Sequence, residues 1–180
     1  MQTEIIIAGF GGQGVLFAGQ ILARAAMADG LNVTWLPSYG PEMRGGTANV
    51  TVIISDEEIA SPLVQQPQVA IALNLPSLQK YEPLMKPGGL LVVNSSLVDS
   101  LPQRSDIISL PIPATDIARE LGSEQVANMV ALGAMIAATG LLPLETIVQT
   151  LRIYVGSDQT ATQDEAALYQ GASLVKAAVV

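Results

Sequence analysis

Residues 9–14 read Gly-Phe-Gly-Gly-Gln-Gly and stand between the apolar run Ile5 to Ala8 and a segment of helical periodicity that begins at Val15. Strand, glycine turn and helix in this order form the context in which such loops bind phosphates. The glycines permit a tight turn, and the helix start supplies unpaired backbone N–H donors and positive dipole potential. We therefore expect a phosphate-facing loop, which suits mononucleotides, dinucleotides and coenzyme A alike. The alternative is that the glycines serve only close packing of helix on strand.

The first half of the chain has the pattern of an α/β sheet. Residues 4–9 and 33–36 read as strands around a helix over 13–29 that Gly30 stops, which makes a βαβ unit and the start of a mononucleotide-binding half fold. Residues 37–46 are too few for a crossover helix, so the strand-like segment 47–55 is expected to run antiparallel. Residues 37–46 then form a structured loop that shares one edge of the sheet with the first glycine loop.

The second half adds strands and then becomes helical. Its fold class is a Rossmann-like α/β fold with a mixed, mostly parallel sheet, one antiparallel strand and a helical C-terminal third, in a single domain over residues 1–180. Ser123 and Asp158 are the expected N-caps of two of these helices. The expected strands are 68–74, 90–94 and 106–110, and the expected helices are 76–85, 115–121, 123–139, 143–154 and 158 to the C-terminus.

The chain contains neither Cys nor His, which removes disulfides, iron–sulfur ligation, thiol nucleophiles, imidazole bases and the usual zinc sites. Carboxylate, Lys, Tyr or Ser/Thr chemistry remains, or a subunit whose partners carry the reactive groups. We favour the subunit, with no catalytic residue and no metal site of its own.

The formal net charge of −8, with only eight Lys and Arg, argues against a nucleic-acid surface. It would also repel an acidic electron carrier such as a ferredoxin, which is expected to dock elsewhere in an assembly. Residues 1–4 lack the basic region of a secretory signal, which favours a cytoplasmic location. The uncharged stretch 125–144 is interrupted by Gly and Pro and is expected to be buried rather than to span a membrane.

The second candidate site lies in residues 38–46. An NAD enzyme should carry an acidic residue after the second strand, where this chain has Leu36, Pro37 and Ser38, so NADP would have to rely on Arg44. Arg44 suits a bidentate phosphate or carboxylate contact, and equally an ion pair or a subunit contact. Tyr39 either stacks on a base or closes the loop. Gly45 and Gly46 would admit a partner's backbone.

Two asparagines complete the candidates. Asn94 follows a strand at the edge where open α/β sheets bind ligands, although it could equally cap the next segment. Asn128 interrupts an apolar helix face, so it either hydrogen-bonds in the core or faces a ligand or partner. The predicted ligand-binding residues are Gly9, Gly11, Gly12, Gln13, Gly14, Ser38, Tyr39, Arg44, Gly45, Gly46, Asn94 and Asn128.

These motifs also carry a resemblance. Gly9 to Gly14, followed by Pro37-Ser38-Tyr39-Gly40-Pro41-Glu42-Met43-Arg44-Gly45-Gly46 and then by Asn128-Met129-Val130 and Gly133, resembles the gamma subunit of 2-oxoacid:ferredoxin oxidoreductases over nearly the whole chain. The sequence from Tyr39 to Arg44 is most similar to that of members that act on 2-oxoglutarate or branched-chain 2-oxoacids. Pyruvate oxidoreductases belong to the same family, and indolepyruvate oxidoreductases contain a similar domain, so those substrates stay open.

The resemblance implies a thiamine-diphosphate assembly that oxidatively decarboxylates a 2-oxoacid, reduces ferredoxin through iron–sulfur clusters and transfers the acyl group to coenzyme A. Thiamine diphosphate, magnesium and the clusters are implied on alpha and beta subunits, with or without a delta subunit. This chain would bind part of coenzyme A at the intersubunit site and be inactive alone. Two other functions stay open: a stand-alone Rossmann oxidoreductase that binds NADP or a flavin, and a purely architectural subunit.

Overall fold

The computed structural model describes residues 1–40, 46–100, 102–155 and 159–178. Within them, six strands form one sheet in the order β2-β3-β1-β4-β5-β6. β1 is parallel to β4, β4 to β5 and β5 to β6, whereas β3 is antiparallel to both of its neighbours, as predicted. The strands are β1 (Gln2–Phe10), β2 (Asn32–Tyr39), β3 (Thr47–Ser55), β4 (Val69–Ala72), β5 (Leu90–Asn94) and β6 (Ile108–Ile112).

The position of β3 differs from a simple βαβ unit. β3 lies between β1 and β2, so the two strands joined by the first helix are not neighbours. Val50, Val52, Ile53 and Ile54 are buried, which suits a strand with partners on both sides. β2 contains Pro37, a residue confined to edge strands because it cannot donate to a ladder. The antiparallel strand therefore takes the inner place and leaves β2 at the edge.

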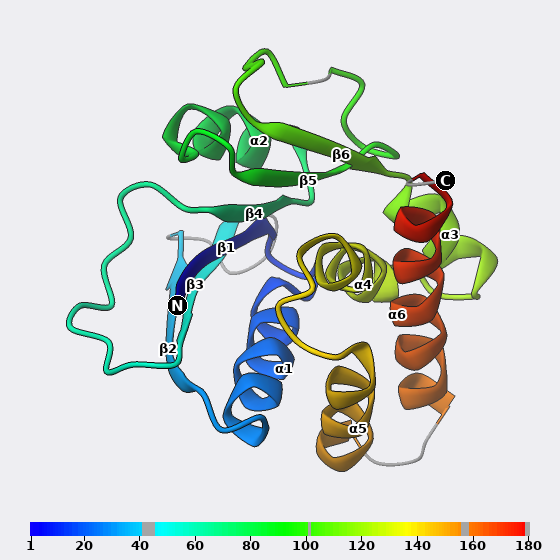
Figure 1. Cartoon of the computed structure of the whole chain (residues 1–180). Helices are drawn as coiled ribbons and strands as arrows, with labels where there is room; N and C mark the ends of the chain where they lie inside the picture. Colours follow the sequence, from blue (N-terminus) through cyan, green and yellow to red (C-terminus); the bar gives the residue numbers. More distant parts are fainter. Residues whose placement is uncertain (41–45, 101, 156–158, 179–180) are drawn as a thin grey trace.

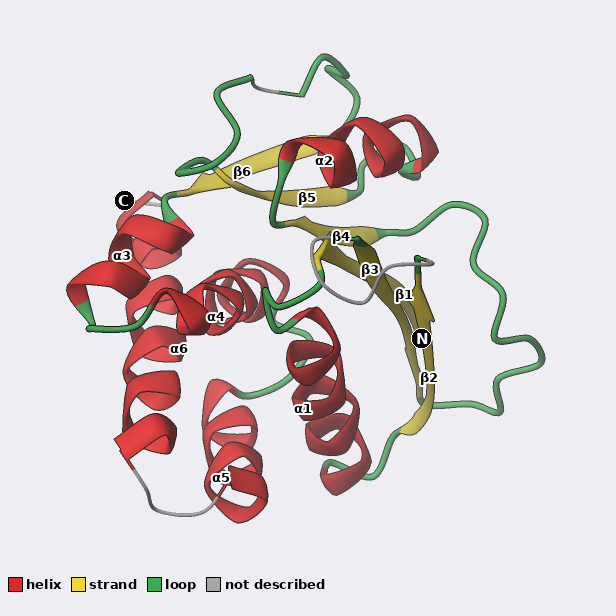
Figure 2. Ribbon diagram, turned by 180° about the vertical axis from the view of Figure 1, so that it is seen from behind, coloured by secondary structure: helices red, strands yellow, loops and turns green. Residues whose placement is uncertain are grey.

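Helices cover the two faces of the sheet unequally (Figures 1 and 2). Most of them pack on the face that presents Ile5 and Ile7, where they enclose the main hydrophobic core. α2 covers the other face with Leu78, which packs against alternate residues of β4 and β5. The helices are α1 (Val15–Ala28), α2 (Leu75–Tyr81), α3 (Ala114–Glu120), α4 (Ala127–Thr139), α5 (Leu144–Val155) and α6 (Gln159–Ala178), with short 3-10 turns η1 (Glu82–Leu84) and η2 (Glu124–Val126).

The predicted helical C-terminal third and the bounds of β3 and β5 are confirmed. The helix expected over 76–85 ends earlier, because Pro83 cannot continue an α-helix, and η1 replaces its last turn. The expected strand 106–110 lies at 108–112 instead. Part of the predicted loop 37–46 is wrong, since residues 37–39 belong to β2 and pair with β3; residues 41–45 and the predicted cap Asp158 lie outside the described residues.

α4 is the central helix of the helical layer, and its residues 127–136 are all buried. It crosses α6 closely at two glycines. A Cβ on Gly133 would lie 2.8 Å from the carbonyl carbon of Leu168, and one on Gly171 would lie 2.8 Å from that of Val130. The helix that contains most of the uncharged stretch 125–144 is therefore packed inside the protein, and no helix among the described residues is long and apolar enough to cross a membrane.

Candidate functional site

The first glycine loop joins β1 to α1 and uses its glycines in two ways. Gly12 and Gly14 have φ of +98° and +71°, a region that favours glycine. Gly9 and Gly14 are packed: a Cβ on Gly9 would lie 2.6 Å from Gln13 Oε1, and one on Gly14 would lie 2.9 Å from Asn128 Cγ. No atom of the described residues lies within 4 Å of the position where a Cβ on Gly12 would stand. Close packing within this part of the chain thus explains Gly9 and Gly14 but not Gly12.

Gln13 holds the loop in shape with its side-chain amide. Its Oε1 accepts from Phe10 N at 2.6 Å and from Asn74 Nδ2 at 3.2 Å, and its Nε2 donates to the Leu73 carbonyl at 3.4 Å. The side chain therefore joins the ends of β1 and β4 at the point where the sheet order reverses direction, the place where open α/β sheets bind ligands.

The second glycine segment meets the first. Gly11 N donates to the Gly46 carbonyl at 2.8 Å, and Gly40 N donates to the Thr47 carbonyl at 2.7 Å. The predicted placement of the two loops at one edge of the sheet is confirmed for these residues. Arg44 and Gly45 lie outside the described residues.

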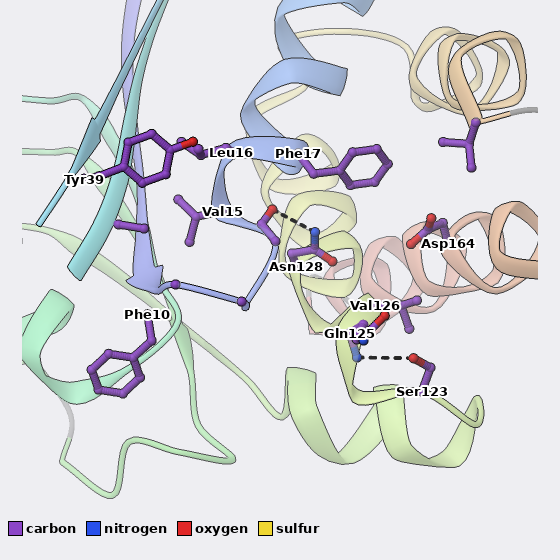
Figure 3. A pocket seen from close by; sticks show the side chains of 15 residues that line it. Phe10, Val15, Leu16, Phe17, Tyr39, Ser123, Gln125, Val126, Asn128 and Asp164 are labelled. Atoms are coloured by element: carbon purple, nitrogen blue, oxygen red, sulfur yellow. Dashed lines mark hydrogen bonds between the residues drawn. The ribbon is translucent and has the colours of Figure 1, made fainter. Parts of the chain in front are cut away.

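A groove of about 530 Å³ opens beside the glycine loop (Figure 3). One wall is the start of α1, and the opposite wall is formed by η2 and by Asp164 of α6. Tyr39, 57% exposed at the end of β2, lines it as well. The lining residues are Phe10, Gly11, Gly12, Gly14, Val15, Leu16, Phe17, Tyr39, Ala48, Ser123, Gln125, Val126, Asn128, Val155 and Asp164.

Asn128 connects the start of α1, on one side of this groove, to α4 of the helical layer. Its Nδ2 donates to the Gly14 carbonyl at 2.9 Å, and its Oδ1 accepts from Met129 N at 2.9 Å. The buried amide is thus paired within the protein while it also lines the groove. On the same wall, Ser123 acts as an N-cap, because its Oγ accepts from Gln125 N at 3.3 Å. It caps the 3-10 turn η2 rather than the α-helix predicted over 123–139, which begins at Ala127.

A second cavity of about 210 Å³ lies on the other side of the loop, at the carboxyl ends of β4 and β5. Asn94 lines it, is buried, and is fully engaged. Its Nδ2 donates to the Leu73 carbonyl at 3.2 Å and to Thr115 Oγ1 at 2.9 Å, and its Oδ1 accepts from Thr115 N at 3.3 Å. Asn94 therefore satisfies a free N–H in the first turn of α3, which is close to the capping alternative.

Asn74 and Thr115 are structural residues of this site that the sequence reasoning missed. Asn74 also caps α2, because its Oδ1 accepts from Ser77 N at 2.9 Å. The signal that selected Asn94, a polar residue just after a parallel strand, would have selected Asn74 too. Thr115 has no comparable signal, since its contact with Asn94 depends on how α3 returns to the sheet. Ser38 of β2, a predicted site residue, lies opposite Asn49 of β3 and lines neither cavity.

The charged side chains that line the two cavities are carboxylates. Among the described lining residues, Asp164 and Glu124 are the charged ones. Glu124 accepts from Arg119 Nε at 2.6 Å, and this hydrogen bond raises the pKa of Arg119 above its ordinary value. An anion could instead meet the N-terminus of α1, which has no side-chain cap and no acidic residue in its first turn. No group of three or more potential metal ligands occurs among the described residues.

Comparison with known proteins gives the family context of this geometry. Residues 4–173 match the family described as pyruvate ferredoxin/flavodoxin oxidoreductase. The 2-oxoglutarate synthase subunit KorC of Methanothermobacter marburgensis is 41% identical over 159 residues, which cover 84% of this chain and 86% of that protein. The ketoisovalerate oxidoreductase subunit VorA of the same organism is 41% identical over 142 residues, which are 78% of this chain but only 30% of VorA.

Two solved structures share the fold. The gamma subunit of a keto/oxoacid ferredoxin oxidoreductase from Geobacter sulfurreducens aligns with a TM-score of 0.84 and 36% identity over 97% of this chain and 99% of that one. The 2-oxoglutarate:ferredoxin oxidoreductase from Magnetococcus marinus, solved with 2-oxoglutarate, coenzyme A and succinyl-CoA, aligns with a TM-score of 0.89 and 27% identity, over 98% of this chain and 31% of that one.

Proposed function

Since the chain belongs to the pyruvate ferredoxin/flavodoxin oxidoreductase family, we propose that it is the gamma subunit of an enzyme that converts a 2-oxoacid to acyl-CoA and reduces ferredoxin. In this proposal the groove beside Gly12 binds part of coenzyme A, and alpha and beta subunits, with or without a delta subunit, complete the active site. Thiamine diphosphate, magnesium and the iron–sulfur clusters belong to those partners. The isolated chain is inactive, and the enzyme works in the cytoplasm.

The observation that carries the ligand proposal is the open side of Gly12 at the mouth of the groove. Gly12 has a conformation that favours glycine, has no neighbour among the described residues within 4 Å on its Cβ side, and stands three residues before Val15, the uncapped start of α1. A phosphate placed there would receive backbone N–H groups and the positive end of the helix dipole. The mainly apolar lining beyond it suits the less polar remainder of a long ligand.

The composition supports the division of labour between subunits. A chain without Cys or His offers no cluster ligands and no imidazole base. The groove's described lining offers no cation either, so neutralising charge for a phosphate has to come from outside that lining. For the 2-oxoacid we propose 2-oxoglutarate or a branched-chain 2-oxoacid; the identities to KorC and VorA, 41% each, support both classes equally.

Gly12→Ala tests the ligand site. In the assembled enzyme this substitution is expected to raise the apparent KM for coenzyme A about tenfold, which corresponds to about 1.4 kcal/mol of lost binding free energy. The physical reason is that the new methyl group enters open space on the ligand side and the backbone resists a φ of +98°. Steady-state kinetics with coenzyme A as the varied substrate gives the measurement.

Gly30→Ala and Gly88→Ala are matched controls. Their φ values are +81° and +77°, and again no described residue lies within 4 Å of the position that a Cβ would take, so they carry a similar backbone strain away from the groove. Each should leave the KM for coenzyme A within about twofold, as an ordinary surface substitution would. If all three variants shift the KM alike, the effect is one of stability, and Gly12 does not face the ligand.

Arg44→Ala tests the cation proposed from the sequence. Arg44 lies outside the described residues, so this prediction depends on the motif alone. The substitution should raise the coenzyme A requirement about tenfold, the scale of a lost charge-assisted hydrogen bond, while assembly is unchanged. Titration of coenzyme A against turnover, with size-exclusion chromatography of the complex, checks both parts. An unchanged requirement removes Arg44 from ligand binding, and a lost complex makes it an interface residue.

The alternatives predict different ligands. A stand-alone oxidoreductase would bind NADP or a flavin by itself, but the place beside the glycine loop that a Rossmann fold gives to its second strand is taken here by β3. Calorimetry with coenzyme A, NADP and FAD separates these functions: tight nicotinamide or flavin binding would favour the oxidoreductase. A purely architectural subunit would show loop substitutions that disturb assembly and never coenzyme A use.

A further inference from the structure

A separate exposed surface lies on the outer side of α1, away from the glycine loop. Gln20, Ala23, Arg24 and Met27 line a shallow groove of about 380 Å³ together with Trp35 of β2. Their spacing puts the four helical residues on one face of α1. Arg24 stands nine residues after the start of the helix, roughly 13 Å along its axis, so this surface is not part of the proposed ligand groove.

The residue types are those of a protein–protein contact. Trp35 is the single Trp of a chain with only 4% aromatic residues, and it is 37% exposed; Met27 is 64% exposed and Tyr154 of α5 is 42% exposed. Trp, Tyr, Arg and Met are enriched at interfaces, and the first three dominate their binding energy. We call Arg24, Met27, Trp35 and Tyr154 the Trp35 surface.

The charge of Arg24 gives the chemistry of the partner. The guanidinium lies 4.2 Å from the centre of the Tyr154 ring, and no carboxylate of the described residues pairs with it. The three other described arginines all have such a partner: Arg104 with Asp106, Arg119 with Asp116 and Glu124, and Arg152 with Glu165. In an acidic chain, the exposed Arg24 is complementary to a carboxylate brought by another molecule.

The adjoining strand edge is also unpaired within the described part of the chain. β2 is the last strand of the sheet and carries no charged residue. Since Gly40 N donates to Thr47 and residues alternate along the strand, the backbone N–H and C=O of Val33 and Trp35 point away from β3. Edge strands normally carry charges or proline, which prevent unwanted pairing. In β2, Pro37 has this effect only near the C-terminal end of the strand. An extended partner segment could therefore pair beside Trp35.

We propose that the Trp35 surface docks a segment of another subunit that presents a carboxylate to Arg24 and an apolar side chain to Trp35 and Met27. That the partner is a subunit of the same enzyme depends on the proposed function. A second copy of this chain is a poorer occupant, because a symmetric contact centred on this surface would bring two unpaired Arg24 side chains together.

Charge reversal in the reconstituted enzyme tests the docking. Arg24→Glu is expected to weaken assembly of this chain with its partners by about tenfold or more, as for a truncated interface charge pair, while Arg24→Lys retains most of the affinity. The matched control is Lys80→Glu, because Lys80 lies 5.0 Å from the centre of the Tyr81 ring on α2, at the other face of the sheet. It should change the Kd of assembly by less than about twofold.

Oxidative footprinting of the wild-type enzyme gives a second, fold-independent readout. Trp35 and Met27 should be protected from hydroxyl radicals in the complex relative to the dissociated chain, whereas Met1, 77% exposed, reports reagent dose. Unchanged Trp35 oxidation, normal assembly of Arg24→Glu, or cross-links between the Trp35 surfaces of two copies would each overturn the proposal. A normal coenzyme A KM of the assembled Arg24→Glu enzyme, beside a raised one for Gly12→Ala, would separate this docking from the proposed function.

Discussion

Gly133→Ala and Gly171→Ala are each expected to lower the free energy of unfolding by about 3 kcal/mol, at the upper end of what overpacking costs. The added methyl group would lie 2.8 Å from a backbone carbonyl carbon of the facing helix, and closer still to its oxygen. A side chain could rotate away, but a helix backbone can only move as a whole. α4 and α6 would have to separate along their contact, and α4 is the buried centre of the helical layer.

Chemical denaturation monitored by circular dichroism measures the loss, and thermal melting should show a decrease of about 6–12 °C for a domain of this size. Gly30→Ala and Gly140→Ala are suitable controls. Both positions have positive φ, at +81° and +62°, with no atom of a described residue within 4 Å of the place where a Cβ would stand, so only backbone strain of about 1 kcal/mol is expected. Equal losses at all four glycines would mean that α4 and α6 are not in close contact at Gly133 and Gly171.

The same pair of glycines shows what a single sequence reveals about this fold. The apolar runs at β1, β4 and β5 and the glycine turn after β1 predict a parallel sheet with helices, because they are local signals. Gly133 is one of the residues on which the family resemblance is based. Its physical role is the close contact with Leu168, thirty-five positions later in the chain. Close helix contacts of this kind have no local pattern, so the sequence shows that a glycine is present without showing what it touches.

The order of the strands in the sheet could not be predicted for a related reason. The short connection after β2 correctly predicts an antiparallel β3, but nothing local says on which side of β2 the new strand lies relative to β1. Pro37 was the available signal, since it favours an edge position for β2. With β3 beside β1, the missing acidic residue after the second strand loses its weight as an argument about NAD, because β2 is not the neighbour of β1 in the sheet.

In the candidate site, too, the local features could be predicted from the sequence and the long-range contacts could not. The glycines were found from their spacing, whereas the groups that pair with the predicted site residues come from three other places in the chain. The Leu73 carbonyl and the Asn74 amide bind Gln13, Asn128 binds Gly14, and Thr115 binds Asn94. Gln13, Asn94 and Asn128, predicted as ligand-binding residues, all have their amide groups engaged within the protein. Among the described site residues, the groups left to meet a ligand are then mainly backbone N–H groups, which the glycine spacing predicts as a set but does not identify one by one.

The second large effect is expected for the substitution Gly14→Ala in the assembled enzyme. Acyl-CoA formation is expected to fall about a hundredfold, which is about 2.7 kcal/mol of transition-state free energy. A Cβ at this position would lie 2.9 Å from Asn128 Cγ, at a φ of +71°. Because Asn128 also donates to the Gly14 carbonyl at 2.9 Å, relief of the clash moves the start of α1 away from α4. A displacement of about 1 Å at a positioning element can cost this much rate.

Two variants separate this geometric effect from lost stability. Gly19→Ala lies on the same helix and presses a methyl group against Val50 Cγ1, a side-chain atom, so it should cost stability while acyl-CoA formation in the folded complex stays within about twofold. Gly14→Ala combined with Asn128→Ala removes the clash but keeps the backbone strain, and should restore part of the rate. If the double variant is as slow as Gly14→Ala, the loss comes from the φ of residue 14 alone. If Gly14→Ala turns over normally, the N–H groups at the start of α1 do not face the coenzyme.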